Sequence, residues 1–377
     1  MAKEEKKAPK LRFNGYTNDW ERKELNNILK INSGRDYKQL NSGSIPVYGT
    51  GGYMLSVNDK LSDTDAVGIG RKGTIDKPLY LKAPFWTVDT LFYCISKESS
   101  DVKFIYLLFQ IINWKRYDES TGVPSLSKNT ISSIKTYVPK VKEQDHISKL
   151  FFSLDNTLQL HERKCEELTL IKKALLQKLF PKKDVIKPEV RYKNFSDAWE
   201  QRKLGEILKE RKERSSIGEL ISVTINNGVV KADSLERKDN SSSDKSNYKV
   251  VCKGDIAYNS MRMWQGASGY SPYNGILSPA YTVLIPTEKV DSKFISYMFK
   301  KEKMLQQFQK YSQGLTSDTW NLKYPMLKDI PVLFPKIDEQ ISIRKHLDNI
   351  SSLIALHQRK LEKLKQLKKF LLQNMFI

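Results

Sequence analysis

Two short segments of the sequence carry side-chain types that can read the edges of DNA bases. In the first, Arg71 and Lys72 stand between two glycines, which predicts an exposed loop. The second follows Tyr258 and contributes polar and aromatic candidates: Asn259, Ser260, Arg262, Trp264 and Gln265. An Arg side chain can fork onto guanine, and Asn or Gln can pair with adenine. These residues are the candidate DNA contacts; the competing interpretation is that the aromatic residues belong to the core and the polar ones are incidental.

Two other stretches resemble catalytic motifs, and both fail on their surroundings. Residues 68–73 match the glycine pattern of a dinucleotide-binding loop, but that pattern needs a helix directly after it, and Pro78 follows in a strand-like segment. Asp233, Glu236 and Lys238 loosely resemble a nuclease cluster, yet their Ser- and Asp-rich surroundings favour a solvated loop. No Walker A loop or amino-methyltransferase motif occurs, and the four histidines all fall in predicted helices. The sequence therefore predicts no catalytic residue, no metal site and no cofactor bound by this chain.

The charge balance favours a polyanionic partner. Lys and Arg total 64 against 43 Asp and Glu, a net charge of +21 in 377 residues, and nucleic acid is the first candidate for such a surplus. Charge alone also leaves an ordinary basic protein open. Three scattered cysteines suggest neither a disulfide framework nor a zinc site. Residues 1–10 lack the apolar region of a signal peptide and no run of 18 apolar residues occurs, so we expect a cytoplasmic protein with no membrane partner.

An internal repeat indicates which elements must position these candidates. Trp20-Glu21 and its neighbours return as Trp199-Glu200 at an offset of 179 residues, with 8 identities in 22 positions. Residues 138–180 align without a gap with 334–376 at an offset of 196, with 18 identities in 43 positions. Composition alone would give about two or three. A period of this length is too long for a solenoid and indicates a duplicated module.

The longer repeat predicts one long helix in each half of the chain. Its apolar residues recur in alternating steps of three and four without an interrupting Pro or Gly, which is typical of a coiled-coil seam. A helix of roughly 35 residues is about 50 Å long and exceeds one turn of DNA. We expect the two helices to pair in antiparallel orientation because the intervening domain must carry the chain back. One seam position in each helix is open between two residues: Ile171 or Lys172, and Leu367 or Lys368.

Two histidines, His161 and His357, occupy matching positions on this seam. A seam histidine could be a metal ligand or a pH switch. We favour a polar residue that fixes the helix register, because no second ligand lies nearby at helical spacing.

The segments between the repeats predict two unlike globular domains. Residues 12–137 and 191–333 show short β-type runs broken by turn residues, and each ends in a helical piece, at 104–114 and 294–311. The fold class is therefore α+β: two globular mixed α/β domains separated by two long antiparallel coiled-coil helices, with pseudo-twofold symmetry. The predicted domains, alternately globular and helical, are 1–137, 138–182, 183–333 and 334–377.

This plan resembles the specificity subunit of type I restriction-modification systems. The likeness rests on the paired Trp-Glu segments, on the paired Pro-Lys and Glu-Gln residues that open the helices, and on reader segments such as 49–52, 70–73 and 258–262. It covers the whole chain. The resemblance implies that each recognition domain reads one half of a bipartite, asymmetric DNA site and that the helices set the spacer.

The resemblance also implies partners. They are double-stranded DNA, two methyltransferase subunits with S-adenosylmethionine, and restriction subunits with ATP and Mg²⁺; none of these cofactors is expected on this chain. The main alternative is a free-standing sequence-specific DNA-binding protein without enzymatic partners, which would bind tightly by itself. A third hypothesis, an enzyme fused to a recognition domain, needs a catalytic set that the sequence does not offer.

Overall fold

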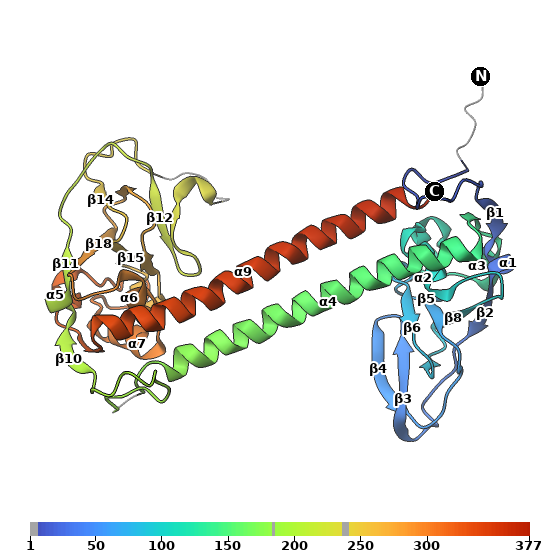
Figure 1. Ribbon diagram of the computed structural model, residues 1–377, viewed down its shortest axis with the longest axis horizontal. Coiled ribbons are helices and arrows are strands. Elements are labelled where there is room, and N and C mark those ends of the chain that lie inside the picture. The colour runs from blue at the N-terminus through green and yellow to red at the C-terminus, as the bar shows by residue number, and fades with distance from the viewer. Residues whose placement is uncertain (1–6, 183–184, 236–240) are drawn as a thin grey trace. The chain divides into compact units, whose positions relative to one another are not determined.

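The computed structural model describes residues 7–182, 185–235 and 241–377 and divides into two compact units (Figure 1). Unit 1 comprises Met1–Arg163 with Gln358–Ile377, and unit 2 comprises Lys164–His357. Each unit combines a globular α/β part with segments of two long helices.

The globular part of unit 1 is built on a four-stranded antiparallel sheet with the order β2-β8-β5-β6. A three-stranded sheet (β4-β3-β7) and a strand pair (β1-β9) accompany it. The elements are β1 (Glu21–Glu24), α1 (Leu25–Ile28), β2 (Leu29–Ser33), β3 (Ser42–Gly49), β4 (Gly52–Val57), β5 (Ala66–Gly70), β6 (Leu79–Leu81), β7 (Trp86–Thr87), β8 (Leu91–Ser96), α2 (Val102–Ile111), the 3-10 helix η1 (Trp114–Tyr117), α3 (Lys128–Ser133) and β9 (Lys135–Val138).

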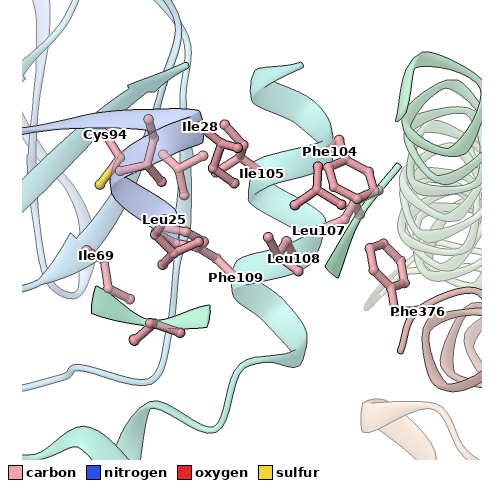
Figure 2. Close-up of a cluster of buried hydrophobic side chains, with 14 of the residues drawn as sticks. Leu25, Ile28, Ile69, Cys94, Phe104, Ile105, Leu107, Leu108, Phe109 and Phe376 are labelled. Carbon is pink, nitrogen blue, oxygen red and sulfur yellow. The ribbon is translucent and has the colours of Figure 1, made fainter. Parts of the chain in front are cut away.

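Apolar side chains from distant parts of the sequence fill the core of unit 1. Figure 2 shows Leu25 and Ile28 of α1 near α2, with Phe376 from the C-terminal segment beside Phe104. The rings of Phe104 and Phe376 stack with centroids 5.5 Å apart. The C-terminal segment is therefore part of the core of unit 1.

Unit 2 repeats this plan with different sequences. Its four-stranded antiparallel sheet has the order β11-β18-β15-β16, accompanied by the strand pairs β10-β19, β12-β13 and β14-β17. The elements are β10 (Glu200–Lys203), α5 (Leu204–Ile207), β11 (Leu208–Glu210), β12 (Ile221–Thr224), β13 (Gly228–Lys231), η2 (Ala232–Ser234), β14 (Lys249–Val251), β15 (Ile256–Asn259), η3 (Met263–Gln265), β16 (Ser268–Tyr270), β17 (Gly275–Leu277), β18 (Tyr281–Pro286), α6 (Ser292–Phe299), α7 (Glu302–Tyr311), α8 (Tyr324–Leu327) and β19 (Pro331–Phe334).

The two long helices are α4 (Val141–Lys178) and α9 (Ile337–Asn374), each of 38 residues. In unit 1 they pair in antiparallel orientation. Two ion pairs show this: Asp155 of α4 pairs with Lys368 of α9, and the later Glu162 pairs with the earlier Lys365. The prediction of an α+β fold with two long antiparallel helices is confirmed.

The two open seam positions are both occupied by lysine. Lys172 and Lys368 are partly buried, whereas Ile171 and Leu367 are 47% and 45% exposed. Lys368 lies 2.6 Å from the Asp155 carboxylate. Burial lowers the pKa of Lys172, and the charge of Asp348 opposes the shift. The long aliphatic stem of lysine can pack in a seam while its ammonium group reaches a carboxylate.

The helical pieces differ in detail from the prediction. In unit 1 the helix begins earlier than expected because Asp101 caps it, with its carboxylate accepting from the Phe104 N–H. In unit 2 the expected helix 294–311 breaks between α6 and α7. At this break two ammonium groups donate to main-chain carbonyls outside both helices. That of Lys300 donates to Gly266, and that of Lys301 donates to Leu176.

Candidate nucleic-acid interface

The two candidate segments occupy equivalent places in the two units. Arg71 follows β5, and Ser260 follows β15; each strand is the third in its four-stranded sheet. The carbonyl oxygen of Arg71 accepts from Leu126 N–H at 2.9 Å, and that of Ser260 accepts from Leu322 N–H at 2.8 Å. Leu126 and Leu322 precede the long repeat in each half but are separated by the same offset of 196 residues. Two segments with no sequence likeness therefore end matched strands and pair with matched residues.

In unit 1, Arg71 and Lys72 are exposed on an anchored loop. The Arg71 N–H donates to Thr90, and the N–H of Gly73 donates to Pro124, each at 2.8 Å. Gly73 has φ +96°, a conformation that favours glycine. No carboxylate in the described part of the chain pairs with either basic side chain, so both can meet an anionic partner.

A cavity of about 830 Å³ lies beside this loop, lined by Arg71, Lys72 and Lys128 together with residues 119–123 and 125–127. Glu119 also lines it, but the hydroxyl groups of Thr130 and Ser127 donate to its carboxylate and lower its pKa. The cavity is thus polar, with more cationic than anionic groups.

In unit 2 the predicted contacts differ in how exposed their side chains are. Arg262 and Gln265 are partly exposed, and the side-chain amide oxygen of Asn259 accepts from the Met261 N–H. The Ser260 hydroxyl is buried and lies 2.9 Å from that of Thr282. Trp264 packs edge-on against Trp320, with ring centroids 5.1 Å apart. Ser260 is therefore buried and Trp264 partly exposed, and the role of each as a DNA contact stays a prediction.

A second loop lies against each candidate loop, and the sequence analysis did not identify either one. In unit 1 it is 118–125, closed by a hydrogen bond from Glu119 N–H to the Ser125 carbonyl. The Asp118 carboxylate accepts from Ser125 and Ser120 N–H groups, which lowers its pKa. In unit 2 it is 312–321, closed by paired main-chain bonds between Gln313 and Asn321. Their composition could have indicated them in the sequence, because both loops are rich in Ser, Thr and Gly. Each directly precedes a short helix, α3 in unit 1 and α8 in unit 2.

The repeated Arg, Trp and Glu residues form one buried cluster in each unit. The Arg12 guanidinium donates two hydrogen bonds to Glu143, at 2.6 and 2.8 Å, and the Trp20 indole N–H donates to the same carboxylate. Arg191, Glu339 and Trp199 repeat this arrangement in unit 2. Both Glu side chains are only 2% exposed. The clusters hold the start of each globular part against the first turn of a long helix.

The glutamine that follows each buried Glu ties the same helix turn to a short helix. Gln144 accepts from the Asp101 N–H at 2.9 Å, and Gln340 accepts from the Asp291 N–H at 2.9 Å. Asp101 and Asp291 are the residues that cap α2 and α6. The repeated Glu-Gln pair therefore positions the globular part of each unit.

A profile of the type I restriction modification DNA specificity domain matches residues 17–170 and 196–366 of this sequence. The chain belongs to this family. The two matched segments begin just before Trp20 and Trp199, so each covers one globular part and most of the long helix that follows it.

Two known members of the type I specificity family are similar to this chain. The specificity subunit of the type I restriction enzyme MjaVIII from Methanocaldococcus jannaschii is 23% identical over 279 residues, which cover 68% of this chain and 64% of that protein. The match thus spans less than two thirds of that relative. The crystal structure of the S subunit of a type I restriction-modification system from M. genitalium superposes with a TM-score of 0.66 at 14% identity, covering 98% of this chain and 99% of that one. This likeness shows a shared fold.

The histidines of this type I specificity-family chain do not gather into a metal site. His161 and His357 are partly buried on the seam, the first in unit 1 and the second in unit 2. Among the described residues no group of three metal-ligating side chains occurs. Of the rejected nuclease-like set, Glu236 and Lys238 lie outside the described residues. No described helix is both long and apolar enough to cross a membrane.

Proposed function

We propose that this chain supplies DNA-sequence specificity to a type I restriction-modification complex, with each unit reading one half of a bipartite, asymmetric site. The observation that carries the proposal is the matched placement of two unlike loops. The first presents Arg71 and Lys72 and the second presents Asn259 and Arg262, at the ends of equivalent strands. A shared frame with different contact residues suits a target whose two halves differ.

The surface of the long helices supports a second part of the proposal, the docking of two methyltransferase subunits. Outward-facing apolar side chains interrupt the charged faces of α4 and α9: Leu160, Leu170, Ile171, Leu353, Leu356, Leu367 and Phe370 are 44–67% exposed. Apolar side chains at helical spacing on a polar helix favour contact with another helix. Restriction subunits would join through the methyltransferases, and S-adenosylmethionine, ATP and Mg²⁺ would bind to these partners. The helices would also set the spacer between the half-sites.

Substitution of the basic loop residues tests the reading role. In the complex with methyltransferase subunits, Arg71→Ala and Arg262→Ala should each weaken binding to the cognate site by about 1–3 kcal/mol if the guanidinium forks onto guanine. Arg22→Ala, at an exposed position of β1, is the matched control and should leave affinity unchanged. Unchanged affinity for Arg71→Ala or Arg262→Ala would remove that residue as a base contact. Tight specific binding by the chain without partners would favour a free-standing DNA-binding protein.

A further inference from the structure

The second loop of unit 2 carries an apolar side chain that nothing in the described chain covers. Leu315 is 101% exposed at the tip of 312–321. In unit 1, Val123 follows Gly122 as Leu315 follows Gly314 in unit 2. Val123 is 56% exposed at the tip of 118–125. Placing a β-branched or leucine side chain in water brings no gain to the isolated fold. Both units therefore present an apolar tip beside the loop that carries the candidate DNA contacts. We call this loop the candidate reading loop; it includes Arg71 and Lys72 in unit 1 and residues 259–265 in unit 2.

The loop that carries Leu315 is held in one shape. Gly314 has φ +137°, and a Cβ there would lie 2.6 Å from the carbonyl oxygen of Thr319. The carbonyl of Thr316 accepts from the N–H groups of Thr319 and Trp320 at 3.0 and 3.1 Å. A tip held in this way loses little conformational entropy on contact with a partner.

The base of the loop is joined to the candidate reading loop. Leu322 N–H donates to the Ser260 carbonyl, and the Trp320 ring packs edge-on against Trp264. Met261, at the exposed turn of the reading loop, is 42% exposed. The apolar tip and the polar reading side chains thus belong to one surface of unit 2.

Positive charge borders this surface. Lys323 follows the loop directly, and its charge acts on Lys249, which pairs with Glu210 at 3.8 Å. Burial lowers the pKa of Lys249, Glu210 opposes the shift, and the charges of Arg214 and Lys323 lower the pKa further. A surface that combines the basic Lys323 and Arg262 with an apolar tip suits a polyanion that also offers apolar groups. DNA has both, in its phosphates and in the thymine methyl groups and base faces.

We infer that Leu315 contacts bases of the half-site read by unit 2, and that Val123 does the same for the half-site of unit 1. The inference rests on the proposed function and extends it to side chains that hydrogen-bonding chemistry alone would not select. Leu315 adds apolar contact to the hydrogen bonds that Arg262 and its neighbours make. Since the contact is to bases, it contributes to specificity and not to general DNA affinity.

Equilibrium binding by the assembled complex with methyltransferase subunits tests the inference. The DNAs are the cognate site, mapped by methylation with the wild-type complex, and two versions in which one or the other half-site is scrambled. Leu315→Ser should raise the Kd for the cognate site about tenfold, which corresponds to about 1.4 kcal/mol. It should leave the Kd unchanged for DNA in which the half-site of unit 2 is scrambled. The slope of log Kd against log salt concentration should also stay unchanged, because no phosphate contact is lost.

Three matched variants sharpen the test. Leu315→Met, which keeps an apolar side chain, should stay within about twofold of wild type. Ile217→Ser removes another exposed apolar side chain of unit 2, 85% exposed but outside both loops, and should have no effect. Lys323→Ala should instead reduce the salt slope by about 1 if it meets a phosphate.

The outcomes separate the inference from the function on which it rests. If the wild-type complex does not distinguish cognate from scrambled DNA, the proposed function fails. If it does, but Leu315→Ser binds as wild type, loses affinity equally for scrambled DNA, or sheds a methyltransferase subunit, the inference is overturned. An equal loss for Ile217→Ser would also overturn it, since the effect would then belong to exposed apolar surface in general.

Discussion

The buried cluster of Arg191 and Glu339 offers the sharpest test of the repeated frame. Arg191→Ala would leave the Glu339 carboxylate, 2% exposed, with the Trp199 indole N–H at 3.3 Å as its one remaining partner among those described. Removing one partner of a buried ion pair typically costs about 3–5 kcal/mol, because the remaining charge stays desolvated. Arg191 keeps 14% of its side chain exposed, so water can reach part of the site and we expect about 3 kcal/mol.

The loss should be measured as the free energy of unfolding of unit 2 in urea, with hydrogen exchange to assign the transition. Arg12→Ala is the matched variant and should destabilise unit 1 instead, since Arg12 and Glu143 repeat the same geometry. Lys336→Ala removes an exposed ion pair with Asp197, whose side chains are 73% and 68% exposed, and should change stability little. The double variant Arg191→Met with Glu339→Leu should recover much of the loss. A loss for Arg191→Ala no larger than that for Lys336→Ala would refute this reasoning.

Two further outcomes follow from other parts of the chain. Burial lowers the pKa of Lys300 to about 8: the residue as a whole is exposed, but its ammonium group is desolvated where it lies against the carbonyls of Ile225 and Gly266. Between this pKa and its ordinary value of 10.5 the unfolded chain binds more protons than the folded one, so the stability of unit 2 should rise relative to Lys300→Met as the pH increases from about 8 to 10 in thermal melts. If the stability difference is independent of pH in this window, the account of Lys300 is wrong. Lengthening both α4 and α9 by one heptad, about 10 Å of helix, should lengthen the spacer by about three base pairs without changing either half-site in the methylated motif. A changed half-site would contradict the role of the helices as a ruler.

The long helices were predictable because their pattern is local. Apolar residues in steps of three and four define the seam without any knowledge of the partner helix. The choice between Ile171 and Lys172 was not local. The lysines at the two seam positions interact with charged groups on other elements, as Lys368 does with Asp155 in an ion pair. The pattern of one helix cannot reveal such partners.

The candidate site was predictable in part. Residue type selected Arg71 and Arg262 as candidate contacts because a guanidinium group can fork onto guanine, and their role as base contacts stays a prediction. The burial of Ser260 depends on Thr282, which arrives from the neighbouring strand β18. The loops at 118–125 and 312–321 were missed because neither shows a periodic pattern. They meet the candidate loops through contacts with residues about fifty positions away, such as the hydrogen bond from the Gly73 N–H to the Pro124 carbonyl and the packing of Trp320 against Trp264.

Exchange of one globular part tests most directly whether each unit reads one half of the target. Residues 12–137 would be replaced by the corresponding segment of another type I specificity subunit, and the complex with methyltransferase subunits would be expressed in cells without a background methylase. Single-molecule sequencing then gives the methylated motif. We predict that one half of the bipartite motif changes to that of the donor while the other half is retained. A motif that changes in both halves, or in neither, would contradict the account.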